Sequence, residues 1–236
     1  MLLPRLRQQV LDANLALVRN GLVLFTFGNA SGISRADGLV VIKPSGVPYS
    51  EMTPEHLVVT DLNGKIVEGH LRPSSDLPTH LVLYKSFPEI GGVSHTHSEF
   101  ATAFAQACSP IPCFGTTHAD YFRGEVPLTE AMTQHEIATG YEENTGHVIV
   151  RRFRNLNPQE VPGVLVASHA PFTWGPTPAA ASETSAILET VARLAYHTLQ
   201  IRGDLGEASS FLREKHFQRK HGSSAYYGQP GNTEKK

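Results

Sequence analysis

Apolar side chains recur at helical spacing in several parts of the chain. In the range 4–20 they fall on one face, which predicts an amphipathic helix that ends before Gly21. A long helix is predicted from Pro178, because Thr177 suits the N-cap and proline suits the first helical position. The other predicted helices cover residues 75–86, 98–107 and 204–218, and the long helix ends near residue 201.

Short apolar runs separated by turn sequences predict strands. These runs cover residues 22–27, 39–42, 57–60, 65–68, 92–97 and 163–168. The turn sequences GNASG, ADG, KPSG and DLNG lie between or beside the first four runs. No internal repeat or low-complexity linker divides the chain. The simplest interpretation is therefore one α/β domain, residues 1–229, with a central, mainly antiparallel β-sheet flanked by helices. The polar tail, residues 230–236, is expected to be disordered.

The composition is that of a globular protein of 236 residues, with 40% hydrophobic and 18% charged residues. A net charge of -2 gives no reason to expect binding to nucleic acid or to anionic membranes. No apolar run reaches the length of a membrane span, and the N-terminus does not resemble a signal peptide, so the expected location is cytoplasmic. The two cysteines, Cys108 and Cys113, are expected to be reduced.

The strongest chemical signal is the sequence His95-Thr96-His97. Residues i and i+2 of a strand point to the same face, so the two imidazoles can share a metal ion. His169 also follows an apolar strand, and Asp76 stands at the start of a predicted helix. Asp76 alone has a simpler explanation, since an acidic residue there stabilises the helix dipole. As a set, the four residues favour a divalent cation, with zinc, manganese or cobalt all compatible with these ligands.

Three loops upstream of the histidine pair are rich in glycine and serine. Backbone N–H groups near glycine and serine hydroxyls can surround an anion, and one lysine adds positive charge. None of the loops matches a P-loop or a dinucleotide motif, and each alone is compatible with an ordinary turn. Together they predict a small phosphorylated ligand. The three loops are Gly28-Asn29-Ala30-Ser31-Gly32, Lys43-Pro44-Ser45-Gly46 and Pro73-Ser74-Ser75-Asp76.

Motifs along nearly the whole chain resemble those of the L-ribulose-5-phosphate 4-epimerase family, a branch of the class II aldolase/adducin-like superfamily. The similar segments, in order, are GNASG, IKPSGVPYS, PSSDLPTH, HTHSEFAT, TTHADYF, SHAPFTWG and KHG-x-x-AYYGQ. The resemblance implies a class II aldolase-like fold and one divalent metal ion per subunit, most naturally Zn²⁺. It also implies a homotetramer with active sites between neighbouring subunits.

The resemblance further implies roles for individual residues. Asp120 and Tyr227 would be the catalytic proton donor and acceptor. The metal ion would be held by Asp76, His95, His97 and His169. The substrate-binding positions would be Gly28, Asn29, Lys43, Ser45, Gly46, Ser74, Ser75, Thr117 and His216.

The implied reaction is the metal-dependent 4-epimerisation of L-ribulose 5-phosphate to D-xylulose 5-phosphate. The C4 proton is not adjacent to the C2 ketone, so the expected route is retro-aldol cleavage, rotation of glycolaldehyde phosphate and re-aldolisation. One alternative is a class II sugar-phosphate aldolase that releases its two fragments. Those enzymes carry glutamate at the position of Asp76, so the aspartate, together with Asp120, favours the epimerase. A non-catalytic, adducin-like interaction module is disfavoured by the three histidines. Several pathways of pentose breakdown would use this chemistry.

Overall fold

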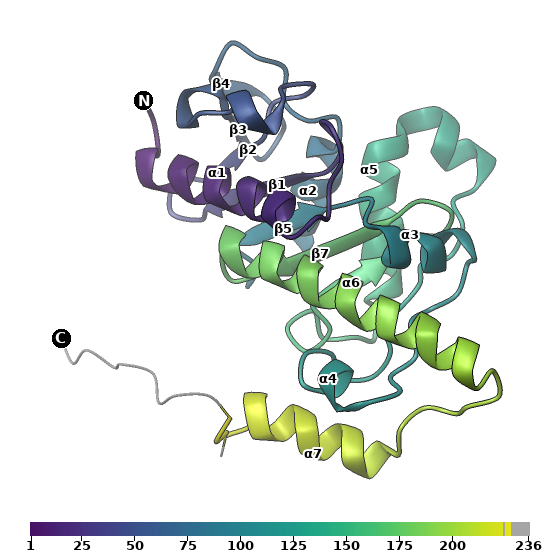
Figure 1. Ribbon diagram of the computed structural model, residues 1–236. Coiled ribbons are helices and arrows are strands. Elements are labelled where there is room, and N and C mark those ends of the chain that lie inside the picture. Colours follow the sequence, from purple (N-terminus) through teal and green to yellow (C-terminus); the bar gives the residue numbers. More distant parts are fainter. Residues whose placement is uncertain (224, 228–236) are drawn as a thin grey trace.

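The computed structural model describes residues 1–223 and 225–227 (Figure 1). Within this part of the chain, seven strands form one sheet in the order β4-β3-β2-β1-β5-β7-β6, and every neighbouring pair is antiparallel. The strands are β1 (Asn29–Ser34), β2 (Leu39–Ile42), β3 (Val58–Asp61), β4 (Ile66–Glu68), β5 (Gly92–His95), β6 (Gly163–Leu165) and β7 (Pro171–Gly175). The expected α/β fold with a mainly antiparallel sheet is therefore confirmed.

Helices cover both faces of this sheet (Figure 1). On one face, the Asn14 amide exchanges hydrogen bonds with the backbone of Ala30 at 2.8 and 2.9 Å, which fixes the first helix on β1. On the other face, Ser31 Oγ lies 2.7 Å from His80 Nδ1. The helices are α1 (Pro4–Arg19), α2 (Leu77–Ser86), α3 (Glu99–Gln106), α4 (Thr116–Ala119), α5 (Gln134–Arg152), α6 (Pro178–Ile201) and α7 (Ser210–His221), with 3-10 turns η1 (Tyr49–Glu51) and η2 (Pro54–His56).

The main hydrophobic core lies between the sheet and the helices. Trp174, Phe172 and Tyr84 are among its largest fully buried side chains. Smaller clusters lie under α1, where Val10 and Leu17 are fully buried. The start of β1 lies beside the end of β5, because Asn29 is paired with His95 in the sheet register.

Most predicted helices are confirmed. The predicted helices at 4–20 and 178–201 match α1 and α6 almost to the residue, and Thr177 Oγ1 accepts a hydrogen bond from the Ala180 amide at 3.1 Å. The predicted helix at 204–218 begins later, at Ser210. None of the helices in the described residues is long and apolar enough to cross a membrane. Cys108 and Cys113 are both free, as expected.

The predicted strand at 22–27 is wrong. The segment turns instead, with Phe25 in the left-handed region at φ 52° and 84% exposed. The first strand of the chain is instead β1, which begins at Asn29, within the sequence GNASG that predicts a turn. Its residues are small because both faces are covered closely: a Cβ on Gly32 would lie 2.7 Å from Pro178, while Ser31 faces α2. The strand β7 and the helix α5 also escape the sequence patterns. The tail 230–236 lies outside the described residues.

Candidate metal centre and active site

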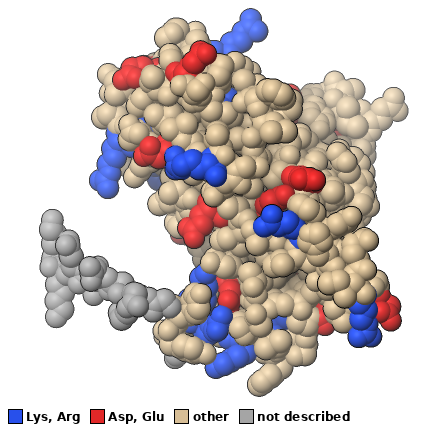
Figure 2. All heavy atoms as spheres, viewed as in Figure 1, with Lys and Arg blue, Asp and Glu red and all other residues tan. Residues whose placement is uncertain are grey.

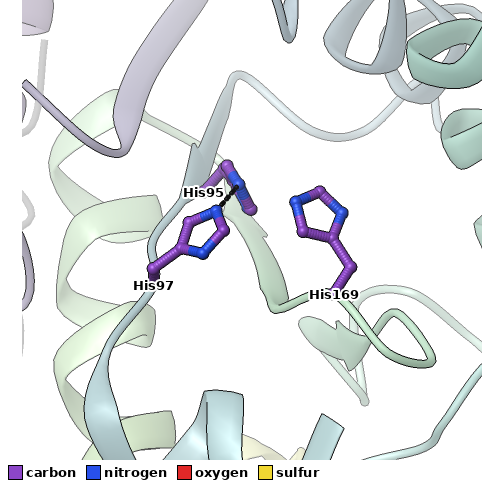
Figure 3. Close-up of side chains that lie close together, drawn as sticks. All are labelled: His95, His97 and His169. Atoms are coloured by element: carbon purple, nitrogen blue, oxygen red, sulfur yellow. Dashed lines mark hydrogen bonds between the residues drawn. The ribbon is translucent and has the colours of Figure 1, made fainter. Parts of the chain in front are cut away.

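Three imidazoles converge at one end of the sheet (Figure 3). His95 ends β5, His97 follows it by two residues, and His169 lies in the turn between β6 and β7. One ring nitrogen from each lies within 4.8 Å of the others, a spacing that one metal ion could bridge. The antiparallel pairing of β5 with β7 brings these sequence-distant residues together, because His95 is paired with Phe172.

The orientation of His95 is fixed from both sides. Its ring stacks on Phe172 with centroids 4.1 Å apart, and its Nδ1 lies 2.9 Å from the Pro171 carbonyl oxygen. A carbonyl oxygen only accepts, so Nδ1 carries the proton and Nε2 presents its lone pair to the cluster. There His95 Nε2 lies 3.1 Å from His97 Nε2. This is the arrangement expected of a histidine prepared to bind a metal ion.

The cluster also has the electrostatics of a cation site. Burial, together with the neighbouring histidines, lowers the pKa of His169 to about 4. Burial likewise lowers the pKa of His97. The imidazoles of His97 and His169 are therefore neutral near pH 7, which is the form that binds metal. In addition, His169 Nδ1 is buried without a hydrogen-bond partner among the described residues. A buried polar atom without a hydrogen bond destabilises the fold, and a bound divalent cation or ligand would remove this cost in free energy.

Asp76 lies at the side of the three histidines, at the N-cap of α2. It is not part of the tightest group of potential ligand atoms. Its Oδ2 accepts a hydrogen bond from Asn29 Nδ2 at 2.6 Å. Burial would raise the pKa of Asp76, but His95, His80 and the Asn29 hydrogen bond together lower it below its usual value. A carboxylate is therefore available beside the imidazoles. His80 is fully buried and is not part of the group of three histidines.

The histidines form one wall of a cavity of about 390 Å³. Seven of the nine predicted substrate-binding residues line the same cavity, namely Gly28, Asn29, Lys43, Ser45, Gly46, Ser74 and Ser75. The loops are linked to one another, since the amide of Ser74 donates to the Lys43 carbonyl oxygen at 2.9 Å. Lys43 is buried, and burial lowers its pKa, while Asp76 opposes this change. The structure thus brings together the predicted metal ligands and the predicted phosphate loops.

Among the lining residues that were not anticipated, two come from α5. Tyr141 and Glu142 enter it from α5, and the Tyr141 ring centroid lies 5.8 Å from that of His169. They follow Gly140, whose φ of 149° breaks the helix and redirects the chain. A sequence signal for α5 does exist: Thr133 and Glu136 form a capping box, with the amide of Glu136 bonded to Thr133 Oγ1 at 3.2 Å.

The remaining predicted site residues lie elsewhere in the subunit. Asp120, at the C-terminus of α4, is bound by α7: His216 Nδ1 lies 3.0 Å from its Oδ1. Tyr227 is 54% exposed beyond the end of α7. Thr117 lines a separate cavity of about 510 Å³ between α1 and α6. None of these four residues lines the histidine cavity, so a single subunit does not unite the two groups.

Comparison with known proteins agrees with the fold. Residues 8–196 match the family model of the class II aldolase and adducin N-terminal domain. The chain is 51% identical over 227 residues to L-ribulose-5-phosphate 4-epimerase UlaF of Salmonella paratyphi A, which covers 96% of this chain and 100% of that protein. The Salmonella typhi protein of that name is equally similar.

Solved structures show the same architecture. An L-fuculose 1-phosphate aldolase superposes with a TM-score of 0.76 at 24% identity, covering 91% of this chain and 95% of that one. YgbL from Klebsiella pneumoniae, described as a putative aldolase/epimerase/decarboxylase, superposes with a TM-score of 0.71 at 24% identity, covering 89% and 97%. These similarities establish the fold of the chain.

Proposed function

The chain belongs to the class II aldolase and adducin family, and on this premise we propose that it converts L-ribulose 5-phosphate to D-xylulose 5-phosphate by metal-dependent 4-epimerisation. The observation that carries the proposal is the histidine cavity, in which three convergent imidazoles face loops rich in N–H and hydroxyl donors. The 51% identity to L-ribulose-5-phosphate 4-epimerases over nearly the full chain supports the choice of substrate.

The metal ion would be held by His95, His97 and His169, with Asp76 at their side. Zinc suits the imidazoles best, and manganese or cobalt could replace it. When bound, a divalent cation supplies Lewis-acid stabilisation of the negative charge that develops on the sugar oxygens. The hydrogen bond from His95 to the Pro171 carbonyl would keep the ligating nitrogen aimed into the cavity.

The phosphate would lie against the loops that carry Ser45, Gly46, Ser74 and Ser75. Their amides and hydroxyls offer several hydrogen-bond donors, and Lys43 lies nearby with its Nζ 3.2 Å from the Pro44 carbonyl oxygen. A phosphate dianion would favour the charged form of this buried lysine. Anchoring at the phosphate leaves the other end of the glycolaldehyde phosphate fragment free to rotate.

Asp120 and Tyr227 would come from the neighbouring subunit of a homotetramer, because they do not line the cavity of their own subunit. One of them removes the C4 hydroxyl proton, the C3–C4 bond breaks, and its electron pair forms the enediolate of dihydroxyacetone. The aldehyde then turns its other face, the bond forms again, and the second residue returns a proton to the C4 oxygen. The product has the opposite configuration at C4.

Release of the two fragments, as in an aldolase, is the alternative. The fold alone does not separate the two, since an L-fuculose 1-phosphate aldolase has the same architecture. Asp76, where the aldolases of this superfamily carry glutamate, favours the epimerase. The three histidines disfavour a non-catalytic module.

The deciding experiment is an assay of the purified protein with L-ribulose 5-phosphate, with and without a chelator. D-xylulose 5-phosphate and free glycolaldehyde phosphate are followed separately. We expect chelator-sensitive formation of D-xylulose 5-phosphate with little free aldehyde. Free aldehyde as the main product would indicate an aldolase, and no turnover by metal-loaded protein would refute the substrate assignment.

A further inference from the structure

Arg219 contacts both residues proposed to transfer protons. Its Nε and one terminal nitrogen donate to the two oxygens of Asp120 at 3.0 and 2.7 Å. Its guanidinium carbon lies 4.7 Å from the centroid of the Tyr227 ring. Its carbonyl oxygen also accepts a hydrogen bond from the Tyr227 amide at 3.1 Å. One residue therefore connects two groups that are 107 positions apart in the sequence, as 227 − 120 shows.

The other residues near Asp120 are basic or uncharged. From α7, His216 Nδ1 lies 3.0 Å from Oδ1, and His221 Nε2 lies 2.8 Å from the Asp120 backbone oxygen. On its own helix, His118 is buried. Lys220 lies over the adjacent Tyr121 ring, 3.2 Å from its centroid. The Asp120 side chain is 11% exposed, so these partners rather than water determine its protonation.

Helix α7 as a whole is basic. Figure 2 shows Lys and Arg side chains gathered over this end of the molecule. The helix carries four Lys or Arg residues and a single Glu. Arg219 differs from the others in its geometry, because it alone forms a two-point fork with Asp120. Such a fork fixes the orientation of a carboxylate, whereas a single ammonium group does not.

We propose that Arg219 is a positioning residue, which holds Asp120 as a carboxylate and fixes Tyr227 beside it, so that both are presented to the neighbouring subunit as one preassembled unit. The inference rests on the proposed function, because it assigns roles within that reaction. Asp120 then accepts the C4 hydroxyl proton as the C3–C4 bond breaks. The Tyr227 phenol donates a proton to the aldehyde oxygen when the bond re-forms. Exchange with solvent restores both groups.

The charge on Asp120 follows from the same contacts. Burial alone would raise the pKa of this carboxyl group. The hydrogen bonds and charges of Arg219 and His216 outweigh burial and lower the pKa below its usual value. Removing Arg219 leaves the burial in place and takes away the stronger of the two partners. The pKa of Asp120 should therefore rise, and the carboxylate should be lost at a higher pH.

The test compares Arg219→Gln and Arg219→Lys with wild type and with Lys215→Gln. Lys215 is an exposed cation on the same helix, so its substitution makes an equal change in charge without touching Asp120. For each protein, kcat and KM for L-ribulose 5-phosphate are measured as a function of pH. Metal content and tetramer mass are measured in parallel, to show that the variants are folded and that the metal site is intact.

We expect Arg219→Gln to lower kcat by about 100-fold, as misplacement of a reacting group by roughly 1 Å does. The acidic limb of kcat/KM should move to higher pH, while KM and metal content stay close to wild type. Arg219→Lys, which keeps the charge but loses the fork, should lower kcat with a smaller shift of the limb. If Arg219→Gln does not fold, Arg219→Lys carries the test. Lys215→Gln should behave as wild type.

Two results would overturn the inference while leaving the epimerase proposal intact. An active wild type with an unmoved pH profile in both Arg219 variants would show that Arg219 does not tune Asp120. A raised KM with unchanged kcat would show that Arg219 binds the substrate phosphate instead. An inactive wild type, fully loaded with metal, would refute the proposed function and this inference together.

Discussion

Replacement of Gly28 by alanine tests a close approach between the segment before β1 and the end of β5, where His95 lies. Gly28 has a φ of 73°, and a Cβ there would lie 2.9 Å from the His95 carbonyl oxygen and 2.7 Å from a methyl group of Val23. The left-handed conformation costs alanine about 1–2 kcal/mol. Overpacking adds about 1–3 kcal/mol. We therefore expect Gly28→Ala to lower the free energy of unfolding by about 2–5 kcal/mol.

Gly46→Ala provides the matched control. Gly46 has a similar φ of 69°, but a Cβ there would meet no atom within 4 Å. Alanine at this position carries only the conformational cost of about 1–2 kcal/mol, and the effect on the unfolded chain is the same for both variants. The difference between the two variants therefore measures the contacts of the added methyl group with Val23 and with the His95 carbonyl oxygen.

The assay is urea unfolding of the metal-free proteins at one protein concentration, followed by a measurement of zinc affinity. Gly28→Ala should lose more stability than Gly46→Ala and should also bind zinc more weakly, because the clash displaces the end of β5. Equal losses of stability in the two variants, with equal zinc affinities, would show that a methyl group at position 28 does not clash with the end of β5.

Three further predictions concern single side chains. His97→Ala should lose bound metal by elemental analysis, whereas His147→Ala, which changes an exposed residue, should keep it; full metal occupancy in His97→Ala would contradict the ligand assignment. Asp120→Asn should lower kcat by at least about 100-fold with unchanged metal content, since an amide cannot accept the proton; unchanged turnover would exclude the role in proton transfer. Burial lowers the pKa of His118 to about 4, so as pH falls from about 6.5 towards 4 the unfolded chain binds a proton that the folded chain does not. The free energy of unfolding should fall by up to about 3 kcal/mol over this range, and it should fall by less in His118→Asn. An equal dependence of the free energy of unfolding on pH in both proteins would show that His118 does not contribute.

Sequence patterns predict the outer elements of the fold better than its centre. Helix α6 has a clear N-cap and a long apolar stripe, so Thr177 and Pro178 mark its start correctly. Strand β1 has no such signal, because close packing of α1 and α6 leaves room only for residues such as Ala30 and Gly32. Asn29, at the start of this strand, also lines the histidine cavity. Because close packing against the helices requires small residues in β1, its sequence predicts a turn and not a strand.

The site shows the same division. The spacing of His95 and His97 predicts that both point to one face. His169 joins them in the prediction only through its place after an apolar strand and through the family resemblance, because no local spacing links it to the pair. That contact depends on the pairing of β5 with β7, and β7 is not recognisable from its pattern. Tyr141 is missed for a different reason: it enters the cavity only because Gly140 breaks α5. Local sequence patterns thus identify potential metal ligands, and the long-range pairing of strands determines which of them lie close together.

The separation of the histidine cavity from Asp120 leads to a last prediction, which tests whether the active site lies between subunits. In a ring of identical subunits, one interface would combine the histidines of one copy with Asp120 of the next. His97→Ala and Asp120→Asn each inactivate every site when expressed alone. In mixed tetramers formed at random from equal amounts of both, about a quarter of the interfaces would pair two intact halves. Co-expression with two affinity tags, followed by isolation of the mixed tetramers, should therefore recover substantial activity. A mixture with no activity would show that both groups act within one chain, and the distance between them in this structure would then require a large rearrangement of α7.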